Sequence, residues 1–403
     1  MTHGIGGSTA EAELAALKPW PNPAPAITPA ERAERLAHAQ ALMADLGADA
    51  MIVGAGPSLR YFAGVGWNAT ERLVAMILPR TGAPVMVCPR FELGSLQASL
   101  GITAEIVLWE EHESPYALAA TVLGDPKAAS LAIDPALPFF AYDGLRLAAP
   151  QVAMMNAAPI VDGCRMIKSP AELALMRQAK AMTLEVHRRA ARILAPGITT
   201  TAVRRFIDQA HRALGADDGS SFCAVQFGLA SAYPHGLPGE QALAQGDLVL
   251  IDTGCKVQGY NSDITRTYVF GTPSADQRRV WDVEKQAQAA AFAAVKPGVA
   301  CEEIDAVARR VLEAAGFGPD YALPGLPHRT GHGIGLSIHE APYLVRGDAT
   351  PLQPGMCFSN EPMIVVPDAF GVRLEDHFHV TETGAAWFTE PQPSLDEPFR
   401  PQN

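Results

Sequence analysis

The second half of the chain contains one pattern written twice. A Pro-Gly turn beginning at Ala195 opens a segment that closes at Gly215, and the same arrangement, without gaps, begins at Lys296 and closes at Gly316. In both copies apolar residues recur at helical spacing, so one amphipathic face is repeated. The matching apolar positions are Val203, Phe206, Ile207 and Ala210 in the first copy and Ile304, Val307, Ala308 and Val311 in the second. The pattern predicts a domain built from two similar halves.

A second repeat follows in the same order. Gly246 begins an apolar run that reaches Asp252 six residues later, and Gly355 begins one that reaches Glu361 at the same distance. Each half is therefore expected to supply a strand that ends in a carboxylate. Two such halves predict a pseudo-twofold domain with a site between them.

The first half of the chain has a different character. Thr28-Pro-Ala-Glu31 and Ser169-Pro-Ala-Glu172 have the form of helix-capping boxes and predict helices reaching about Leu46 and Leu194. Between them lie short strand-like runs at 50–53, 73–78, 84–87, 105–108 and 131–133. Because 403 residues exceed what one core usually supports, we expect an N-terminal arm (1–27), a small α/β domain (28–162) and a larger domain (163–403).

Composition excludes several partners. The net charge is −12 and Lys and Arg form no cluster, which argues against nucleic acid. No apolar run approaches the roughly 18 residues that cross a bilayer, and the first 26 residues hold no signal-peptide core. The six scattered cysteines are typical of reduced thiols. We expect a cytoplasmic protein that binds neither nucleic acid nor membrane.

Asp252 and Asp263 are the first candidates for chemistry. The segment between them, with Gly254 and Gly259, suits a hairpin that folds the second acid back beside the first. Two carboxylates so close repel each other unless a cation lies between them. The alternative is that Asp263 forms a structural ion pair with Arg266.

The C-terminal half adds further ligand types. Gly331-His-Gly-Ile-Gly-Leu-Ser-Ile-His-Glu places His332 and His339 among glycines, and Glu361 and Glu375 border apolar stretches. Four carboxylates and one imidazole form an oxygen-rich set that suits two divalent ions. A hydroxide bridging two cations is a nucleophile at neutral pH, so the set favours hydrolysis.

Five motifs, in order, resemble the pita-bread metallopeptidases, a family that includes prolidase, aminopeptidase P, methionyl aminopeptidase and the non-peptidase creatinase. They are Asp252-Thr-Gly, Gly259-Tyr-Asn-Ser-Asp263-Ile-Thr-Arg-Thr, Gly331-His-Gly-Ile-Gly-Leu with His339-Glu, Asn360-Glu-Pro and Arg373-Leu-Glu-Asp376. The likeness covers about 165–385. The run from Asp49 to Gly64 is similar to the creatinase-like N-terminal domain. The resemblance implies an α+β fold: a C-terminal pseudo-twofold pita-bread domain behind a smaller N-terminal α/β creatinase-like domain.

The resemblance also implies roles for single residues. Two divalent ions, Mn²⁺ first and Co²⁺ or Zn²⁺ as alternatives, would be held by Asp252, Asp263, His332, Glu361 and Glu375. Glu361 would also deprotonate the attacking water, and His235 and His339 would contact the scissile group. His328 and Arg373 would bind substrate, although a structural role for Arg373 is equally open. Family members often form homodimers, so a homodimer is expected.

The implied activity is hydrolysis of Xaa-Pro dipeptides, as in prolidase, by a metal-bridging hydroxide. Xaa-Pro aminopeptidases share every motif and remain the alternative. A metal-dependent lyase of a small metabolite is the rival class, and a binding scaffold ranks last because no ligand is lost. Creatinase hydrolyses its substrate without metal and lacks this set of acids, so the acids count against that reaction.

Gly236 and Ser337 depart from common family residues near the expected pocket. The loops at Trp20 and Trp67 are candidates to reach a site.

Overall fold

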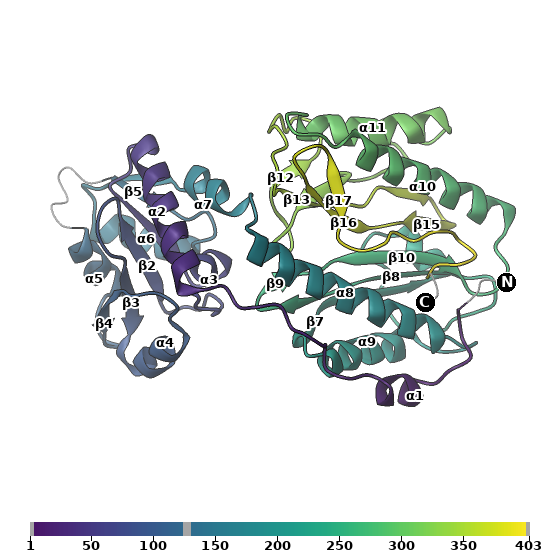
Figure 1. Ribbon diagram of the computed structural model, residues 1–403, viewed down its shortest axis with the longest axis horizontal. Helices are drawn as coiled ribbons and strands as arrows, with labels where there is room; N and C mark the ends of the chain where they lie inside the picture. The colour runs from purple at the N-terminus through teal and green to yellow at the C-terminus, as the bar shows by residue number, and fades with distance from the viewer. Residues whose placement is uncertain (1–3, 124–129, 400–403) are drawn as a thin grey trace. The chain divides into compact units, whose positions relative to one another are not determined.

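The computed structural model describes residues 4–123 and 130–399 and divides into two compact units (Figure 1). One unit is Ala26–Arg165, and the other combines Met1–Pro25 with Met166–Asn403. No described helix is both long enough and apolar enough to cross a bilayer.

The smaller unit is an α/β domain around a six-stranded sheet in the order β4-β3-β2-β1-β5-β6. Its strands are β1 (Ala50–Gly54), β2 (Ala75–Pro79), β3 (Val85–Pro89), β4 (Glu105–Trp109), β5 (Ser130–Ile133) and β6 (Ala153–Asn156). Its helices are α2 (Pro29–Leu46), α3 (Pro57–Ala63), α4 (Leu93–Ser99), α5 (Pro115–Val122), α6 (Phe139–Ala148) and α7 (Ala158–Arg165). The five strand-like runs of the sequence are confirmed. Strand β6 was missed, because four residues at a half-exposed sheet edge carry no clear alternation.

The predicted capping residues begin their helices. The Thr28 hydroxyl accepts from the backbone N–H of Glu31 at 3.1 Å, and α2 ends at Gly47 in the left-handed region. Ser169 and Glu172 form the reciprocal capping box that opens helix α8 (Pro170–Arg192). Both helices therefore begin where the sequence predicted, because the cap is a local interaction.

The first half of the larger unit joins α8 and α9 (Thr200–Leu214) to an antiparallel sheet. Its strands are β7 (Asp217–Phe227), β8 (Leu248–Val257), β9 (Tyr260–Asn261) and β10 (Ile264–Val269), in the order β10-β8-β7 with β9 beside β8. The β8–β10 pairing confirms the predicted hairpin, and its register sets Thr265 opposite Asp252. Asp252 thus lies in the middle of strand β8, whereas the sequence pattern predicts it at the end of a strand.

The second half joins α10 (Ala275–Ala294) and α11 (Cys301–Ala314) to a second sheet in the order β12-β11-β13-β16-β17. Its strands are β11 (Gly331–Gly333), β12 (Glu340–Leu344), β13 (Cys357–Asn360), β16 (Asp376–Val380) and β17 (Ala385–Trp387), beside the separate pair β14 (Met363–Val366) and β15 (Phe370–Arg373). A core of apolar side chains from α10, α11, β13 and β16 packs between helices and sheet.

The two halves repeat one element order: a long helix, a Pro-Gly turn, a second helix and a sheet. The turn glycines, Gly197 and Gly298, have φ values of +82° and +88°, which only glycine adopts without strain. In Figure 1 the helix pair α8 and α9 and the pair α10 and α11 lie on opposite sides of the unit, with the strands between them. The predicted duplication is confirmed.

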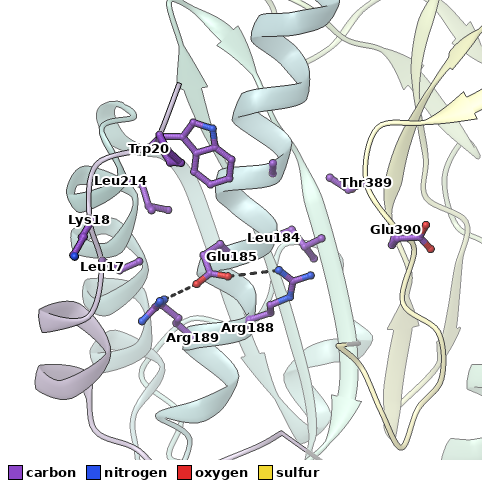
Figure 2. Close-up of a pocket in the computed structure, with 12 residues that line it drawn as sticks. Leu17, Lys18, Trp20, Leu184, Glu185, Arg188, Arg189, Leu214, Thr389 and Glu390 are labelled. Carbon is purple, nitrogen blue, oxygen red and sulfur yellow. Dashed lines mark hydrogen bonds and ion pairs between the residues drawn. The ribbon is translucent and has the colours of Figure 1, made fainter. Parts of the chain in front are cut away.

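The N-terminal arm packs on the larger unit. It contains the helix α1 (Ala10–Ala15) and then runs extended along α8 and α9, with the N–H of Trp20 donating to the carbonyl of Leu214 at 2.9 Å. Figure 2 shows Trp20 beside α8, at a cavity of about 380 Å³ whose lining also includes Leu184 and Arg188. Trp20 therefore lines a pocket separate from the one described below.

Candidate metal centre

Strands from both halves of the larger unit bring the four acids together. Asp252 lies within β8 and Asp263 directly precedes β10, while Glu361 follows β13 and Glu375 lies between β15 and β16. A bridge between Thr265 and Glu375 connects β10 to the segment that enters β16. The carboxylates that are far apart in sequence therefore meet where the two halves face each other.

The alternative prediction, an ion pair between Asp263 and Arg266, is wrong. Arg266 is fully buried and its Nη2 lies 2.7 Å from Asp376 Oδ1. Asp263 is left facing the other acids.

His332 presents one ring nitrogen to these acids. Its Nδ1 lies 3.0 Å from the carbonyl oxygen of Gly333, which can only accept, so Nδ1 carries the proton and Nε2 carries the lone pair. That Nε2 lies 3.1 Å from Glu361 Oε1 and 4.0 Å from Asp263 Oδ2. Ser359 Oγ accepts from the His332 N–H and donates to Glu361 Oε1. A histidine oriented by a backbone carbonyl is the usual form of a metal ligand.

Several polar atoms at this point are buried without a hydrogen-bond partner in the described part of the chain. They are Asp252 Oδ1, Asp263 Oδ1, Glu375 Oε1 and His332 Nε2. Each unpaired buried polar atom costs free energy, and a buried carboxylate costs more. Ligand atoms of His332, Glu361 and Glu375 all lie within 4.8 Å of one another. The residues therefore fit divalent cations, which would satisfy all of these atoms at once.

The pKa values show the same crowding of negative charge. Burial raises the pKa of Asp263 well above its usual value, and the charges of Glu375 and Asp252 add to it. Burial and the charge of Glu361 likewise raise the pKa of Glu375. Burial also acts on Glu361, but its neighbours His332, His328 and Arg373 outweigh it and lower its pKa to about 2. Without a cation, the acids cannot all ionise together.

The acids lie at a cavity of about 730 Å³. Besides Asp252, Asp263, Glu361 and Glu375, its wall contains the other sequence candidates His235, His328, His339 and Arg373. His332 is 1% exposed, and its ring lies edge-on to that of His339 with centroids 4.1 Å apart. The structure thus brings every predicted site residue to one place. Apolar side chains that the sequence did not single out complete the wall: Phe222, Pro234, Pro327, Ile338 and Val345.

Two of the wall residues already have partners. Arg373 Nη2 contacts Asp252 Oδ2 at 2.5 Å, and its Nε donates to Thr265 Oγ1 at 3.1 Å. His328 Nδ1 bonds to the carbonyl of Arg329 at 2.7 Å, while Arg309 donates to the His328 carbonyl at 2.6 Å. Both side chains are held by the protein itself.

The sequence reasoning missed His377. Asp263, Glu375 and His377 form another group whose ligand atoms lie within 4.8 Å of one another. Burial lowers the pKa of His377 well below its usual value. The signal was present in the spacing, because His377 follows Glu375 by two residues where the chain enters strand β16 (Asp376–Val380).

Comparison with known proteins matches the two units separately. Residues 174–382 match the model of metallopeptidase family M24, and residues 35–167 match the creatinase/prolidase N-terminal domain. The two matches together cover most of the described chain.

Individual relatives agree with the family models. The chain is 40% identical to the probable dipeptidase PepE of Mycobacterium tuberculosis over 359 residues, which are 88% of this chain and 93% of the relative. It is 32% identical to an Xaa-Pro dipeptidase of Lactobacillus helveticus over 344 residues, 84% of this chain and 92% of the relative. The crystal structure of dipeptidase PepE from Mycobacterium ulcerans superposes with a TM-score of 0.85 at 37% identity, covering 92% of this chain and 99% of that one. The chain therefore belongs to metallopeptidase family M24, with a creatinase/prolidase N-terminal domain ahead of its pita-bread peptidase domain.

Proposed function

We propose that this metallopeptidase is a dinuclear dipeptidase that hydrolyses Xaa-Pro dipeptides. The observation that carries the proposal is the convergence of four carboxylates and the free Nε2 of His332 on one cavity. The relatives named dipeptidase and Xaa-Pro dipeptidase support the substrate class.

Five residues would hold the ions: Asp252, Asp263, His332, Glu361 and Glu375. When bound, two divalent ions lower the pKa of a water and polarise the scissile carbonyl. The predominance of carboxylate oxygens favours Mn²⁺, with Co²⁺ or Zn²⁺ as the alternatives.

The remaining polar groups would move protons and hold the substrate. Glu361, ionised and held by Ser359, would take the proton of the attacking water. Burial and the neighbouring His332 lower the pKa of His339 to about 4, so its imidazole is neutral at pH 7. A neutral imidazole carries one N–H, which His339 or His235 would donate to the developing oxyanion or to the leaving nitrogen.

The two residues predicted to bind substrate, His328 and Arg373, are assigned different roles. His328 would contact the proline residue from the cavity wall. The contacts of Arg373 with Asp252 and Thr265 favour orientation of a metal ligand over capture of a substrate carboxylate.

The substrate is tested on the purified chain with Mn²⁺, Co²⁺ or Zn²⁺. Proline release from Xaa-Pro dipeptides, with slower cleavage of Xaa-Pro-Xaa tripeptides and of dipeptides without proline, is the expected result. Faster cleavage of the longer peptides would make the enzyme an Xaa-Pro aminopeptidase. Absence of proline release with every metal would refute the prolidase activity. Cleavage of dipeptides without proline would then leave a dipeptidase of other specificity, and cleavage of no peptide would leave the lyase class.

The ligands are tested separately from the substrate. Asp263→Asn should lose metal content as well as activity, because the amide is a weaker ligand than the shared carboxylate. Asp282→Asn, at an exposed position of α10, is the matched control. Full metal content and full activity in Asp263→Asn would refute the ligand assignment.

A further inference from the structure

His377 is a fully buried histidine whose ring makes no hydrogen bond to any described residue. It is 0% exposed, and neither Nδ1 nor Nε2 has a hydrogen-bond partner in the described part of the chain. An unsatisfied buried polar group costs about 1–3 kcal/mol, so a folded protein rarely leaves both nitrogens of a buried imidazole unpaired. A partner from outside the described protein atoms would therefore stabilise the buried ring.

The strand geometry directs this ring toward the acids. His377 lies opposite Ser359 in the β13–β16 register, and Ser359 holds His332 and Glu361. Its neighbours in the strand, Asp376 and Phe378, point to the opposite face, where Asp376 meets Arg266. His377 thus belongs to the face of the sheet that carries the metal centre.

The distance between His377 and Glu375 matches a shared ion. His377 Nε2 lies 3.9 Å from Glu375 Oε1, which is itself unpartnered in the described chain. Two ligand atoms that each lie about 2.1 Å from one ion are at most about 4.2 Å apart. The third atom of the group comes from Asp263, and the three ligand atoms lie within 4.8 Å of one another.

We propose that His377 is a sixth protein ligand of the metal centre, binding through Nε2 an ion that Asp263 and Glu375 also hold. The inference rests on the proposed dinuclear site and extends it beyond the five residues assigned above. A second imidazole beside His332 makes the centre richer in nitrogen. Imidazole suits Zn²⁺ and Co²⁺ better than Mn²⁺, so His377 should raise the preference of this chain for the former ions.

A competing partner for the imidazole is Lys180. This lysine is 0% exposed, donates to the carbonyl of Asn261 at 3.0 Å and lies 4.8 Å from the ring centre of Phe388. If Lys180 donates to His377 instead, the histidine is a packing residue. The experiment must therefore separate a ligand from a neighbour of the ligands.

The metal alone is the probe. Calorimetric titration of the metal-free full-length chain with Zn²⁺ and with Mn²⁺ is compared among the parent, His377→Leu and His379→Leu. His379 is the matched control, since it lies on the same strand and face two residues further on, where its ring packs at 5.1 Å from that of Phe388. The parent should bind two Zn²⁺. His377→Leu should bind one of them at least about 10–100-fold more weakly and lose less affinity for Mn²⁺, while His379→Leu binds like the parent.

Each result of the titrations tests a different assignment. Equal Zn²⁺ affinity in the parent and His377→Leu overturns the inference. Fewer than two Zn²⁺ in the parent overturns the dinuclear centre itself. Should His377→Leu fail to fold, a zinc-bound crystal structure of the parent decides: an Nε2–Zn²⁺ distance of about 2.1 Å supports the inference, and an imidazole bonded to Lys180 refutes it.

Discussion

Arg266 and Asp376 form an ion pair, with 2.7 Å between Nη2 and Oδ1 and neither side chain exposed. The Nη1 group of the same guanidinium donates to the carbonyl of Glu375 at 3.0 Å. Gln288 donates to the second oxygen of Asp376 at 3.1 Å. The pair thus holds the backbone from which Glu375 projects toward the proposed metal centre.

Removing one partner of this pair should destabilise the protein strongly. Asp376→Ala leaves the Arg266 charge buried without compensation, for which we expect a loss of about 3–5 kcal/mol in the free energy of unfolding. Urea denaturation of the metal-free protein measures it. Asp396→Ala breaks an exposed pair with Arg278 and should cost less than about 1 kcal/mol. Equal losses in the two variants would contradict the prediction.

Thr265 should control metal affinity through Glu375. Its hydroxyl donates to Glu375 Oε2 at 2.7 Å and accepts from Arg373, so it orients one proposed ligand and the arginine beside another. Thr265→Val should weaken metal binding by about 10–100-fold, the usual effect of losing such a partner. Thr253→Val is the control, because that buried hydroxyl donates to the carbonyl of Phe222. Calorimetric titration should show the loss only in Thr265→Val.

Glu361→Gln should separate catalysis from substrate binding. The amide cannot take a proton from water, so kcat should fall by about 10²–10⁴-fold while KM changes little. Steady-state kinetics on an Xaa-Pro dipeptide, at metal concentrations that saturate the variant, measure both constants. A variant that keeps the parental kcat at full metal loading would remove Glu361 from proton transfer.

Stability should fall in weak acid because of buried histidines away from the centre. His211 accepts or donates hydrogen bonds with Thr183 and Ser220, and burial lowers its pKa to about 4. The unfolded chain, with a histidine pKa of about 6.5, then binds more protons than the folded one between about pH 6.5 and 4. Stability is therefore complete above that window and declines as pH falls through it, by up to about 3 kcal/mol for this group.

The variant His211→Gln removes this titration. Urea unfolding of the metal-free protein across pH 4–7 should show a shallower decline than in the parent. His38→Gln, at an exposed position of α2, should keep the parental decline. An unchanged slope in His211→Gln would contradict the assignment.

Much of the fold follows from local features of the sequence. Ser169 and Glu172 begin α8 through a cap that spans three residues, and the two Pro-Gly turns repeat because glycine alone accepts their backbone angles. The pattern could not predict where Asp252 lies within β8, because strand ends depend on partners far along the chain. Edge strand β6 escaped detection because its four half-exposed residues show no clear alternation.

The sequence by itself determined the duplicated halves, and it predicted four acids and four histidines that the structure brings together, because both are expressed in residue types and short spacings. Only the tertiary structure decided which buried charges pair. Arg266 meets Asp376, 110 residues away, rather than Asp263 nearby. That contact arises because strands from different halves pack together. Within the second sheet, the pairing of β13 with β16 sets His377 opposite Ser359. No local pattern encodes either relationship, because the partners are distant in sequence.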